Sequence, residues 1–303
     1  MASFYLITGF LGSGKTTLLK NILYEIGNKK KIAIIQNEFA STGIDGKELK
    51  LINDQFKLVE INNGSVFCVC QLGNFIDTIH QILENYQPEI IFLETSGLAD
   101  PISISELLMH SSFKGKIRLE KIITVVDSRN FERGLQLMPR FRHQLMVADT
   151  ILMNKAELAK QSLTGIHKKV LEIAPFGSII HTDFCQLSLN KLFNLPASEL
   201  NHLQFNGHES AGRPSEVQTL VLRTGDQLSH QGLLDFVGFL KRNSLRSKGF
   251  VNLSDGRKVI FHTVFDDEDI TEIKGYMGLT EIIVFTSNLQ LAELRQQFKS
   301  RSD

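Results

Sequence analysis

Apolar runs of strand length alternate with segments of helical periodicity through roughly the first two-thirds of the chain. The apolar and β-branched runs that predict strands are Phe4–Thr8, Lys31–Gln36, Lys57–Ile61, Glu89–Glu94, Ile122–Asp127, Thr150–Met153 and Ser178–His181. Apolar residues at helical spacing predict helices at Thr16–Ile26, Leu72–Tyr86, Ser103–His110 and Glu157–Ala174. This alternation is typical of α/β proteins, so we predict a mostly parallel sheet that is flanked by helices.

The pattern changes after residue 200. Asn201–Ser215 is polar and contains glycine, which predicts a linker. Beyond it we expect strands at Glu216–Arg223, Gly249–Leu253, Lys258–Val264 and Glu281–Thr286, and helices at Gln231–Lys241 and Leu289–Phe298. Asp255-Gly256 lies between two of these strands and predicts a hairpin. We therefore predict a first domain over residues 1–200, a linker over 201–215 and a smaller C-terminal α+β domain over 216–303.

The first predicted strand and helix are joined by a phosphate-binding loop. Gly9-Phe10-Leu11-Gly12-Ser13-Gly14-Lys15-Thr16 matches the pattern G-x-x-x-x-G-K-[ST] in its expected strand–helix context. Glycines let backbone N–H groups turn toward a phosphate, and the helix directs its positive end at the same charge. Lys15 would lie against the β- and γ-phosphates, and the Thr16 hydroxyl would ligate Mg²⁺. The residues expected to hold the phosphates are Gly12, Ser13, Gly14, Lys15, Thr16 and Thr17. The chain is thus predicted to be a P-loop NTPase.

Two predicted strands end in a carboxylate. Glu94 ends the fourth strand, and a carboxylate there can hold Mg²⁺ through water or orient the attacking water. Gly97 follows and could give its backbone N–H to the γ-phosphate, so that hydrolysis reshapes the segment. The alternative for Glu94 is an ordinary strand-end acid. Asp127 ends the fifth strand, and for this residue the structural role is the favoured interpretation.

The polar segment after the second strand is a candidate switch. Gln36-Asn37-Glu38-Phe39 and, further on, Asp45 in a glycine-rich stretch could close over Mg²⁺ and the γ-phosphate. The alternative is a solvated loop with acids that cap helices.

Asn154-Lys155-Ala156-Glu157 follows another buried strand, at the place where guanine-reading GTPases carry Asn-Lys-x-Asp. The carboxylate of that motif accepts the paired N–H donors of guanine, and adenine lacks this pair. Glu157 is one methylene longer than aspartate and can accept the same bonds only if the loop adjusts. Its alternative role is to place negative charge at a helix start. We expect GTP rather than ATP.

Cys68 and Cys70 have the i, i+2 spacing that lets two thiolates grip one ion such as Zn²⁺. Two ligands do not complete a site, so the others must come from Glu38, a histidine, water or a second chain. The alternative is two buried small hydrophobic residues. Cys185 is expected to serve packing, and the linker histidines, His202 and His208, are expected to be solvated.

Composition narrows the class of protein. The 303 residues carry 33 Lys+Arg and 33 Asp+Glu, and this zero net charge argues against a nucleic-acid partner. No apolar stretch has the length of a membrane span, the first residues predict a strand rather than a leader, and three cysteines are too few for a disulfide framework. We expect a cytoplasmic protein with no membrane partner.

Taken together, the motifs resemble those of the CobW-type metallochaperone GTPases, P-loop proteins related to the nickel-insertion GTPases of urease and hydrogenase. The similar segments are Gly9–Thr17, Asn37–Phe39 with Asp45, Glu94–Pro101, Ala148-Asp149, Asn154-Lys155 and Arg246–Phe250. The resemblance runs nearly from end to end of the chain. It implies a slow GTPase whose nucleotide state controls the capture and delivery of a divalent metal, often zinc or cobalt, to a client metalloprotein or cofactor enzyme.

By the family pattern, Lys15 and Thr16 bind phosphate and Mg²⁺, Glu94 and Asp45 serve hydrolysis, and Glu38 and the cysteine motif hold the transported metal. A homo-oligomer is a further expectation. Two departures stand out. The family motif is Cys-x-Cys-Cys soon after Asn-Gly, whereas here Cys70 is followed by Gln71. The second departure is Glu157 in place of aspartate.

Two other function classes stay open on the sequence. The first is a GTPase that remodels or activates a partner enzyme without carrying metal, in which case Cys68 and Cys70 would be structural. The second is a small-molecule kinase with Arg140 and Arg142 as lid residues, which Glu94–Pro101 and the second domain disfavour.

Overall fold

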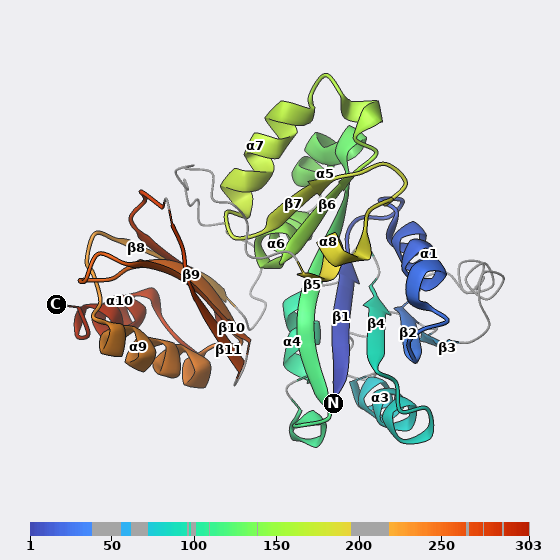
Figure 1. Cartoon of the computed structure of the whole chain (residues 1–303), viewed down its shortest axis with the longest axis horizontal. Coiled ribbons are helices and arrows are strands. Elements are labelled where there is room, and N and C mark those ends of the chain that lie inside the picture. Colours follow the sequence, from blue (N-terminus) through green and yellow to red (C-terminus); the bar gives the residue numbers. More distant parts are fainter. Residues whose placement is uncertain are drawn as a thin grey trace. The chain divides into compact units, whose positions relative to one another are not determined.

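The computed structural model describes residues 1–37, 56–61, 72–95, 97, 101–108, 110–137, 139–194, 218–264, 267–274, 276–286 and 288–302. The chain divides into two compact units, Met1–Ser198 and Glu199–Asp303 (Figure 1). The predicted linker, residues 201–215, lies outside the described residues, so the predicted domain boundaries stay a prediction.

The first unit is built on a seven-stranded sheet in the order β3-β2-β4-β1-β5-β6-β7. Its strands are β1 (Ala2–Thr8), β2 (Ile32–Asn37), β3 (Lys57–Ile61), β4 (Ile90–Glu94), β5 (Ile117–Asp127), β6 (Thr150–Asn154) and β7 (Ser178–His181). All of its strand pairs are parallel. In the register, Ile7 pairs with Glu94 and Asp127 pairs with Asn154. The carboxyl ends of β1, β4, β5 and β6 therefore meet at one edge, where ligands bind in such sheets.

The helices of this unit cover both faces of the sheet. They are α1 (Lys15–Ile26), α3 (Leu72–Asn85), α4 (Pro101–Leu108), α5 (Phe131–Leu137), α6 (Pro139–Val147), α7 (Leu163–Ile173) and α8 (Leu189–Asn194), with 3-10 turns at η2 (Ser111–Phe113), η3 (Ser128–Asn130) and η4 (Glu157–Ala159). Because side chains alternate along a strand, Val125 packs in one core with apolar residues of α1 and α8. Val126 packs in another core with residues of α5, α6 and α7. Figure 1 shows α1 on one side of the sheet, with α4 and α6 on the other.

All seven strands predicted for this unit are present, which confirms the α/β fold class. The single helix predicted over Glu157–Ala174 is wrong, because it is two elements, η4 and α7. The amides of Leu158, Ala159 and Ser162 each bond to the carbonyl three residues earlier, so this stretch is too tightly wound to continue as an α-helix. The sequence analysis also missed α5 and α6.

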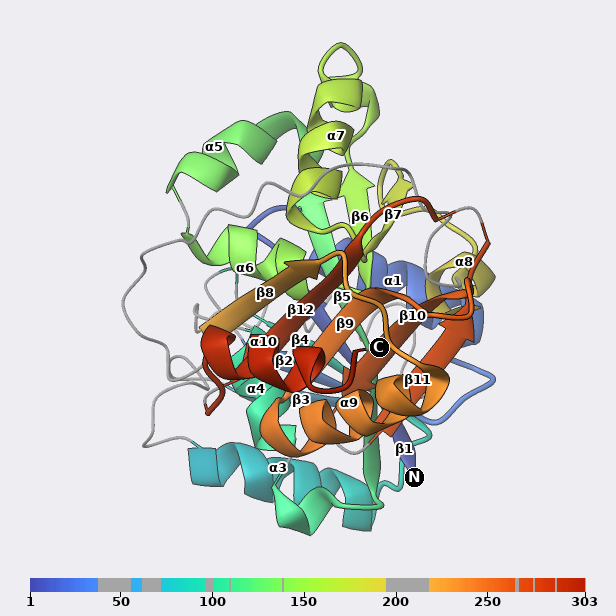
Figure 2. The ribbon, with the colours of Figure 1, turned by 90° about the vertical axis from the view of Figure 1, so that its left-hand side faces the viewer.

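The second unit is an antiparallel five-stranded sheet in the order β11-β10-β9-β12-β8. Its elements are β8 (Gln218–Thr224), α9 (His230–Asn243), β9 (Arg246–Asn252), β10 (Lys258–Val264), β11 (Asp267–Glu272), β12 (Thr280–Thr286) and α10 (Leu291–Lys299). Figure 2 shows α9 and α10 on one face of this sheet, where the rings of Phe236 and Phe298 lie 5.1 Å apart.

The α+β character predicted for the C-terminal part is confirmed. The β9–β10 hairpin turns at Asp255-Gly256, and Gly256 has a φ of +87° that favours glycine. The sequence analysis missed β11, because its residues DEDITE lack the apolar alternation of a strand. Within the described residues, no helix has the length and apolar character needed to span a bilayer.

Candidate functional site

The loop between β1 and α1 wraps around the Lys15 ammonium group. Gly9, Gly12 and Gly14 have φ values of +133°, +74° and +113°, conformations that residues with a Cβ rarely adopt. Lys15 is only 7% exposed, and its Nζ donates to the carbonyls of Gly9 at 3.0 Å and Phe10 at 3.2 Å. The positive charge is therefore held within the curve of the loop.

Several groups in and around this loop suit a phosphate–magnesium ligand. The buried Ser13 hydroxyl has no hydrogen-bond partner among the described residues. Thr16 Oγ1 donates to Glu94 Oε1 at 2.9 Å, and Gln36 Nε2 donates to Glu94 Oε2 at 2.8 Å. Glu94 is 8% exposed. The structure thus brings Lys15, Thr16 and Glu94 together, and the hydroxyl and carboxylate oxygens are of the kind that Mg²⁺ prefers.

Gly97 lies directly against the phosphate loop. A Cβ on Gly97 would come within 2.8 Å of the backbone nitrogen of Leu11. Gln144 Nε2 of α6 donates to the carbonyl of Gly97 at 3.3 Å. Only glycine fits this close approach of two backbones, so a side chain at position 97 would displace the phosphate loop.

Asn154 and Lys155 also contact the loop. Asn154, which is 2% exposed, donates from Nδ2 to the carbonyl of Ser13 at 2.8 Å. Lys155 Nζ donates to the carbonyl of Gly12 at 2.7 Å and to Asp127 Oδ2 at 2.6 Å. Lys155 has a left-handed φ of +58°, an uncommon conformation for a residue with a side chain. The predicted base-reading pair is therefore tied to the phosphate loop by its own side chains.

Asp127 serves as a cap and as the partner of Lys155. Its Oδ1 accepts the backbone N–H groups of Arg129 and Asn130 at the start of η3. Burial acts to raise the pKa of Asp127, but hydrogen bonds from Lys155 and Asn130 outweigh it and hold that pKa below its ordinary value. The carboxylate is therefore charged at neutral pH.

The structure does not bring the Glu157 carboxylate to the loop. The side chain is 71% exposed, and Glu157 Oε2 lies 3.6 Å from Lys160 Nζ. The backbone N–H of Glu157 donates to Asp183 Oδ1 at 3.1 Å, at the start of η4. Its part in reading guanine stays a prediction.

The turn after β7 is a part of the site that the sequence analysis missed. The backbone N–H of Cys185 donates to Asn154 Oδ1 at 3.0 Å, and Cys185 Sγ lies 3.4 Å from the carbonyl oxygen of Gly14. Asn21 of α1 donates to the carbonyls of Phe184 and Cys185, both at 2.9 Å. Burial raises the pKa of the Cys185 thiol to about 12. The sequence of this turn carries no motif, and the one available signal was its position in the loop that follows β7, the last strand of the sheet.

The remaining predicted residues divide into two groups. Thr17 lies in the first turn of α1. Glu38, Asp45, Cys68 and Cys70 lie outside the described residues. Among the residues that are described, no group of three or more His, Cys, Asp or Glu side chains could hold a metal ion.

The family model described as "CobW/HypB/UreG, nucleotide-binding domain" matches residues 3–180. The chain belongs to this family. Among curated relatives, it is 31% identical over 183 residues to the zinc chaperone CobW of a Sinorhizobium species, covering 52% of this chain and 51% of that protein. It is 30% identical over 198 residues to the zinc chaperone YjiA of Escherichia coli, covering 62% and 60%.

It is also 28% identical over 234 residues to the zinc-regulated GTPase metalloprotein activator 1 of Schizosaccharomyces pombe, covering 73% and 53%. The matched part of the chain thus spans between half and two thirds of the length of these relatives. Among solved structures, a Zn(II)-bound triple mutant of the YjiA GTPase matches with a TM-score of 0.61 at 20% identity, over 100% of this chain and 99% of that one. This likeness supports the shared fold of the two proteins.

Proposed function

We propose that the protein hydrolyses GTP slowly and couples hydrolysis to the binding and delivery of a divalent metal, as a metallochaperone GTPase. The observation that carries this proposal is the contact between Thr16 Oγ1 and Glu94 Oε1 at 2.9 Å, beside the buried ammonium group of Lys15. It supports a triphosphate site in which a metal ligand and a carboxylate are neighbours.

In this scheme each side chain has a separate role. Lys15 neutralises the β- and γ-phosphates, and the unpartnered Ser13 hydroxyl is available to them. Thr16 would ligate Mg²⁺, and this ion would supply positive charge to the bound phosphates. Glu94, released from Thr16, would then hold the metal's water shell or orient the attacking water. Gly97 would donate its backbone N–H to the γ-phosphate. Loss of that phosphate would remove this hydrogen bond and change the conformation of the segment that follows β4.

We propose GTP rather than ATP as the substrate. This proposal is supported by the sequence context, since Asn154 ends β6 and Lys155 follows it, as in the guanine-reading motif. The Glu157 carboxylate would accept the paired donors of guanine. Because Glu157 is exposed, its side chain is free to rotate toward a base.

The metal part of the proposal is supported by the relatives, which are named zinc chaperones and a zinc-regulated metalloprotein activator. We propose zinc or another divalent transition metal as cargo, with Glu38, Cys68 and Cys70 as its ligands and Asp45 as a residue that serves hydrolysis. A client metalloprotein or cofactor enzyme, a homo-oligomer and a cytoplasmic location complete the proposal.

The nucleotide part is tested by comparing Lys15→Ala with Lys29→Ala, a surface substitution in the turn after α1. We expect Lys15→Ala to lose most GTP affinity and turnover, and Lys29→Ala to keep both. Unchanged nucleotide binding in Lys15→Ala would overturn the proposal.

The metal part is tested by zinc titration with a GTP analogue, with GDP and without nucleotide. A ligand shifts a switch only by its different affinity for the two states, so the proposal requires unequal zinc affinities. The same titrations of Cys68→Ser/Cys70→Ser separate cargo from structure. Unchanged zinc affinity in that variant would favour the alternative, a GTPase that remodels a partner, which the Gln71 departure leaves open.

A further inference from the structure

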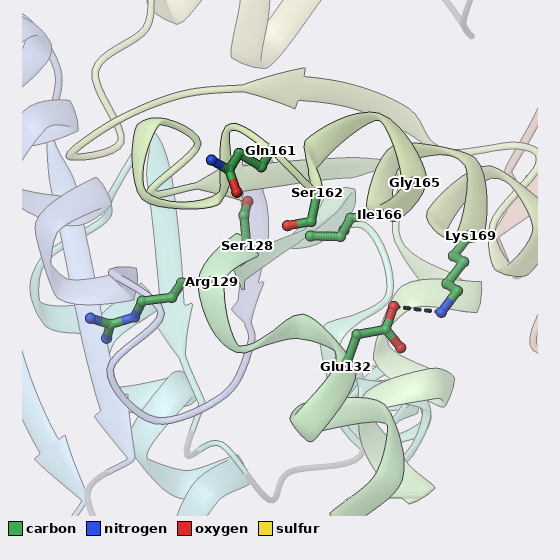
Figure 3. A pocket seen from close by; sticks show the side chains of 8 residues that line it. All are labelled: Ser128, Arg129, Glu132, Gln161, Ser162, Gly165, Ile166 and Lys169. Carbon is green, nitrogen blue, oxygen red and sulfur yellow. Dashed lines mark hydrogen bonds and ion pairs between the residues drawn. The ribbon is translucent and has the colours of Figure 1, made fainter.

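The first unit contains a cavity of about 300 Å³ that none of the predicted nucleotide-binding residues line. It lies between η3 and the start of α5 on one side, and Gln161 and α7 on the other (Figure 3). The α7 wall presents Ser162, Gly165, Ile166 and Lys169, which share one helix face at i, i+3, i+4 and i+7. A Cβ on Gly165 would meet no described atom within 4 Å, so this glycine leaves the cavity open.

A buried, unsatisfied hydroxyl forms the inner wall of the cavity. Ser128 is 1% exposed, and its Oγ has no hydrogen-bond partner among the described residues. In Figure 3 the Ser128 hydroxyl points to the side of the cavity on which Gln161 lies. Native proteins rarely leave a buried polar group unpaired, and those that remain often face a ligand or a water.

The amino terminus of α7 lies on the facing wall of the cavity. The first amides of a helix have no acceptor within the helix, and the Ser162 side chain does not cap them. Instead, Ser162 Oγ donates to the carbonyl of Ala159 at 3.1 Å. An eleven-residue helix therefore directs the positive end of its dipole at the Ser162 end of the cavity.

The charged side chains of the cavity favour the same sign of ligand. Arg129 and Lys169 line it together with one acid, Glu132. Lys169 Nζ lies 2.5 Å from Glu132 Oε1, so one positive charge is already balanced at that end. Arg129 Nη2 lies 3.8 Å from Asp127 Oδ2, and the same carboxylate oxygen lies 2.6 Å from Lys155 Nζ, so one acid is shared by two cations and one net positive charge remains beside the cavity.

We propose that this cavity binds a small anion, with its phosphate or carboxylate group held by the Ser128 hydroxyl and the first amides of α7, and with Arg129 contributing positive charge from the rim. Helix amino termini and guanidinium groups are recurrent binders of such anions, and phosphate and carboxylate share the oxygen acceptors that these donors need. The Lys169–Glu132 pair would face the polar remainder of the ligand, since a second negative charge there would meet Glu132.

The cavity is joined to the phosphate loop through one carboxylate. Ser128 and Arg129 directly follow Asp127, whose Oδ1 fixes the turn that carries them. Asp127 Oδ2 binds Lys155, and Lys155 binds the carbonyl of Gly12. If the proposed function holds, anion binding changes nucleotide affinity, and nucleotide changes anion affinity by the same factor.

Anion binding is measured on the full chain, saturated with GDP and Mg²⁺ so that the phosphate loop does not compete. Inorganic phosphate and acetate are titrated separately, and the amide NMR signals of Leu163, Thr164 and Gly165 are followed. The two arms distinguish a phosphate-bearing from a carboxylate-bearing ligand. We expect saturable shifts with at least one anion, and a loss of affinity of about tenfold in Ser128→Ala and in Gly165→Leu, which fills the cavity.

Lys168→Gln is the control for the two cavity variants, because Lys168 is an exposed lysine on α7 that does not line the cavity. The control should bind as the parent does. Non-saturable shifts with both anions, or equal affinities in the parent, Ser128→Ala and Gly165→Leu, would overturn the proposal. If the proposed nucleotide function is wrong, the protein will not bind GDP. The anion titrations of the parent and the cavity variants are then carried out without nucleotide, and they still test the cavity.

Discussion

Gly14→Ala tests how closely the phosphate loop, β6 and the turn after β7 are packed. A Cβ on Gly14 would come within 2.5 Å of Asn154 Nδ2 and 3.2 Å of Cys185 Sγ, at a φ of +113°. Gly12 offers a matched control, because its φ of +74° is also positive but its Cβ would meet no described atom within 4 Å. Gly12→Ala therefore adds backbone strain alone, and Gly14→Ala adds strain and a collision.

The two costs can be separated in magnitude. A left-handed conformation costs a residue with a Cβ about 1–2 kcal/mol, which is the expected destabilisation in Gly12→Ala. In Gly14→Ala the Asn154 amide must also move, and this disturbs its bonds to Ser13 at 2.8 Å and Cys185 at 3.0 Å. At about 1 kcal/mol for each bond, the total destabilisation is about 3–4 kcal/mol.

The assay is urea unfolding of the full chain, which gives the free energy of unfolding of the first unit. The decisive comparison adds Asn154→Ala, which removes the colliding amide. In that background we expect Gly14→Ala to cost only the strain, so the double variant should be more stable than the sum of the single effects predicts. Additive effects, or equal losses in Gly14→Ala and Gly12→Ala, would refute the proposed packing.

His167 Nδ1 and His181 Nε2 lie 2.8 Å apart, and burial lowers the pKa of both below the ordinary 6.5, so the unfolded chain takes up protons first. Unfolding free energy should therefore fall as the pH drops below about 6.5, less steeply in His181→Gln, and an unchanged slope would contradict this. Burial raises the pKa of Cys185 to about 12, so little of its reactive thiolate is present at pH 8. In a variant that keeps Cys185 as its one cysteine, we expect the reaction with iodoacetamide at pH 8 to be roughly a thousandfold slower in the folded protein than in urea, as measured by mass spectrometry. Glu157→Asp should raise the GTP-over-ATP preference in competition binding and Glu157→Gln should lower it, whereas equal preferences would argue against base reading by this residue.

The central part of the candidate site could be predicted because parallel strands bring their carboxyl ends to one edge. Glu94 pairs with Ile7, close to where β1 leads into the phosphate loop. An acid at the end of β4 is therefore expected to lie near Thr16. The glycines of the loop carried the same information, since Gly9, Gly12 and Gly14 all have the positive φ that the motif implies.

What escaped prediction depends on contacts between distant segments. The Cys185–Gly14 contact joins residues 171 positions apart, and nothing in the segment HTDFCQ distinguishes it from an ordinary loop. The direction of the Glu157 side chain likewise follows from the local 3-10 turn, which a motif match does not specify. The strand β11 was also missed, because its acidic sequence has no strand pattern. It is held in the sheet by backbone pairing with β10, which side-chain patterns do not predict.

The contacts of Asn154 and Lys155 change how variants of this motif should be interpreted. Both side chains donate to carbonyls of the phosphate loop, those of Ser13 and Gly12, so removing either one loosens the loop as well as the base-reading segment. A loss of GTP affinity in such a variant is therefore expected even if the motif makes no contact with the base. Glu157 has no such connection, since its side chain is exposed and its nearest charged partner is Lys160. Nucleotide preference measured in Glu157 variants consequently reports on the base, whereas total affinity measured in Asn154 or Lys155 variants reports on the loop and the base together.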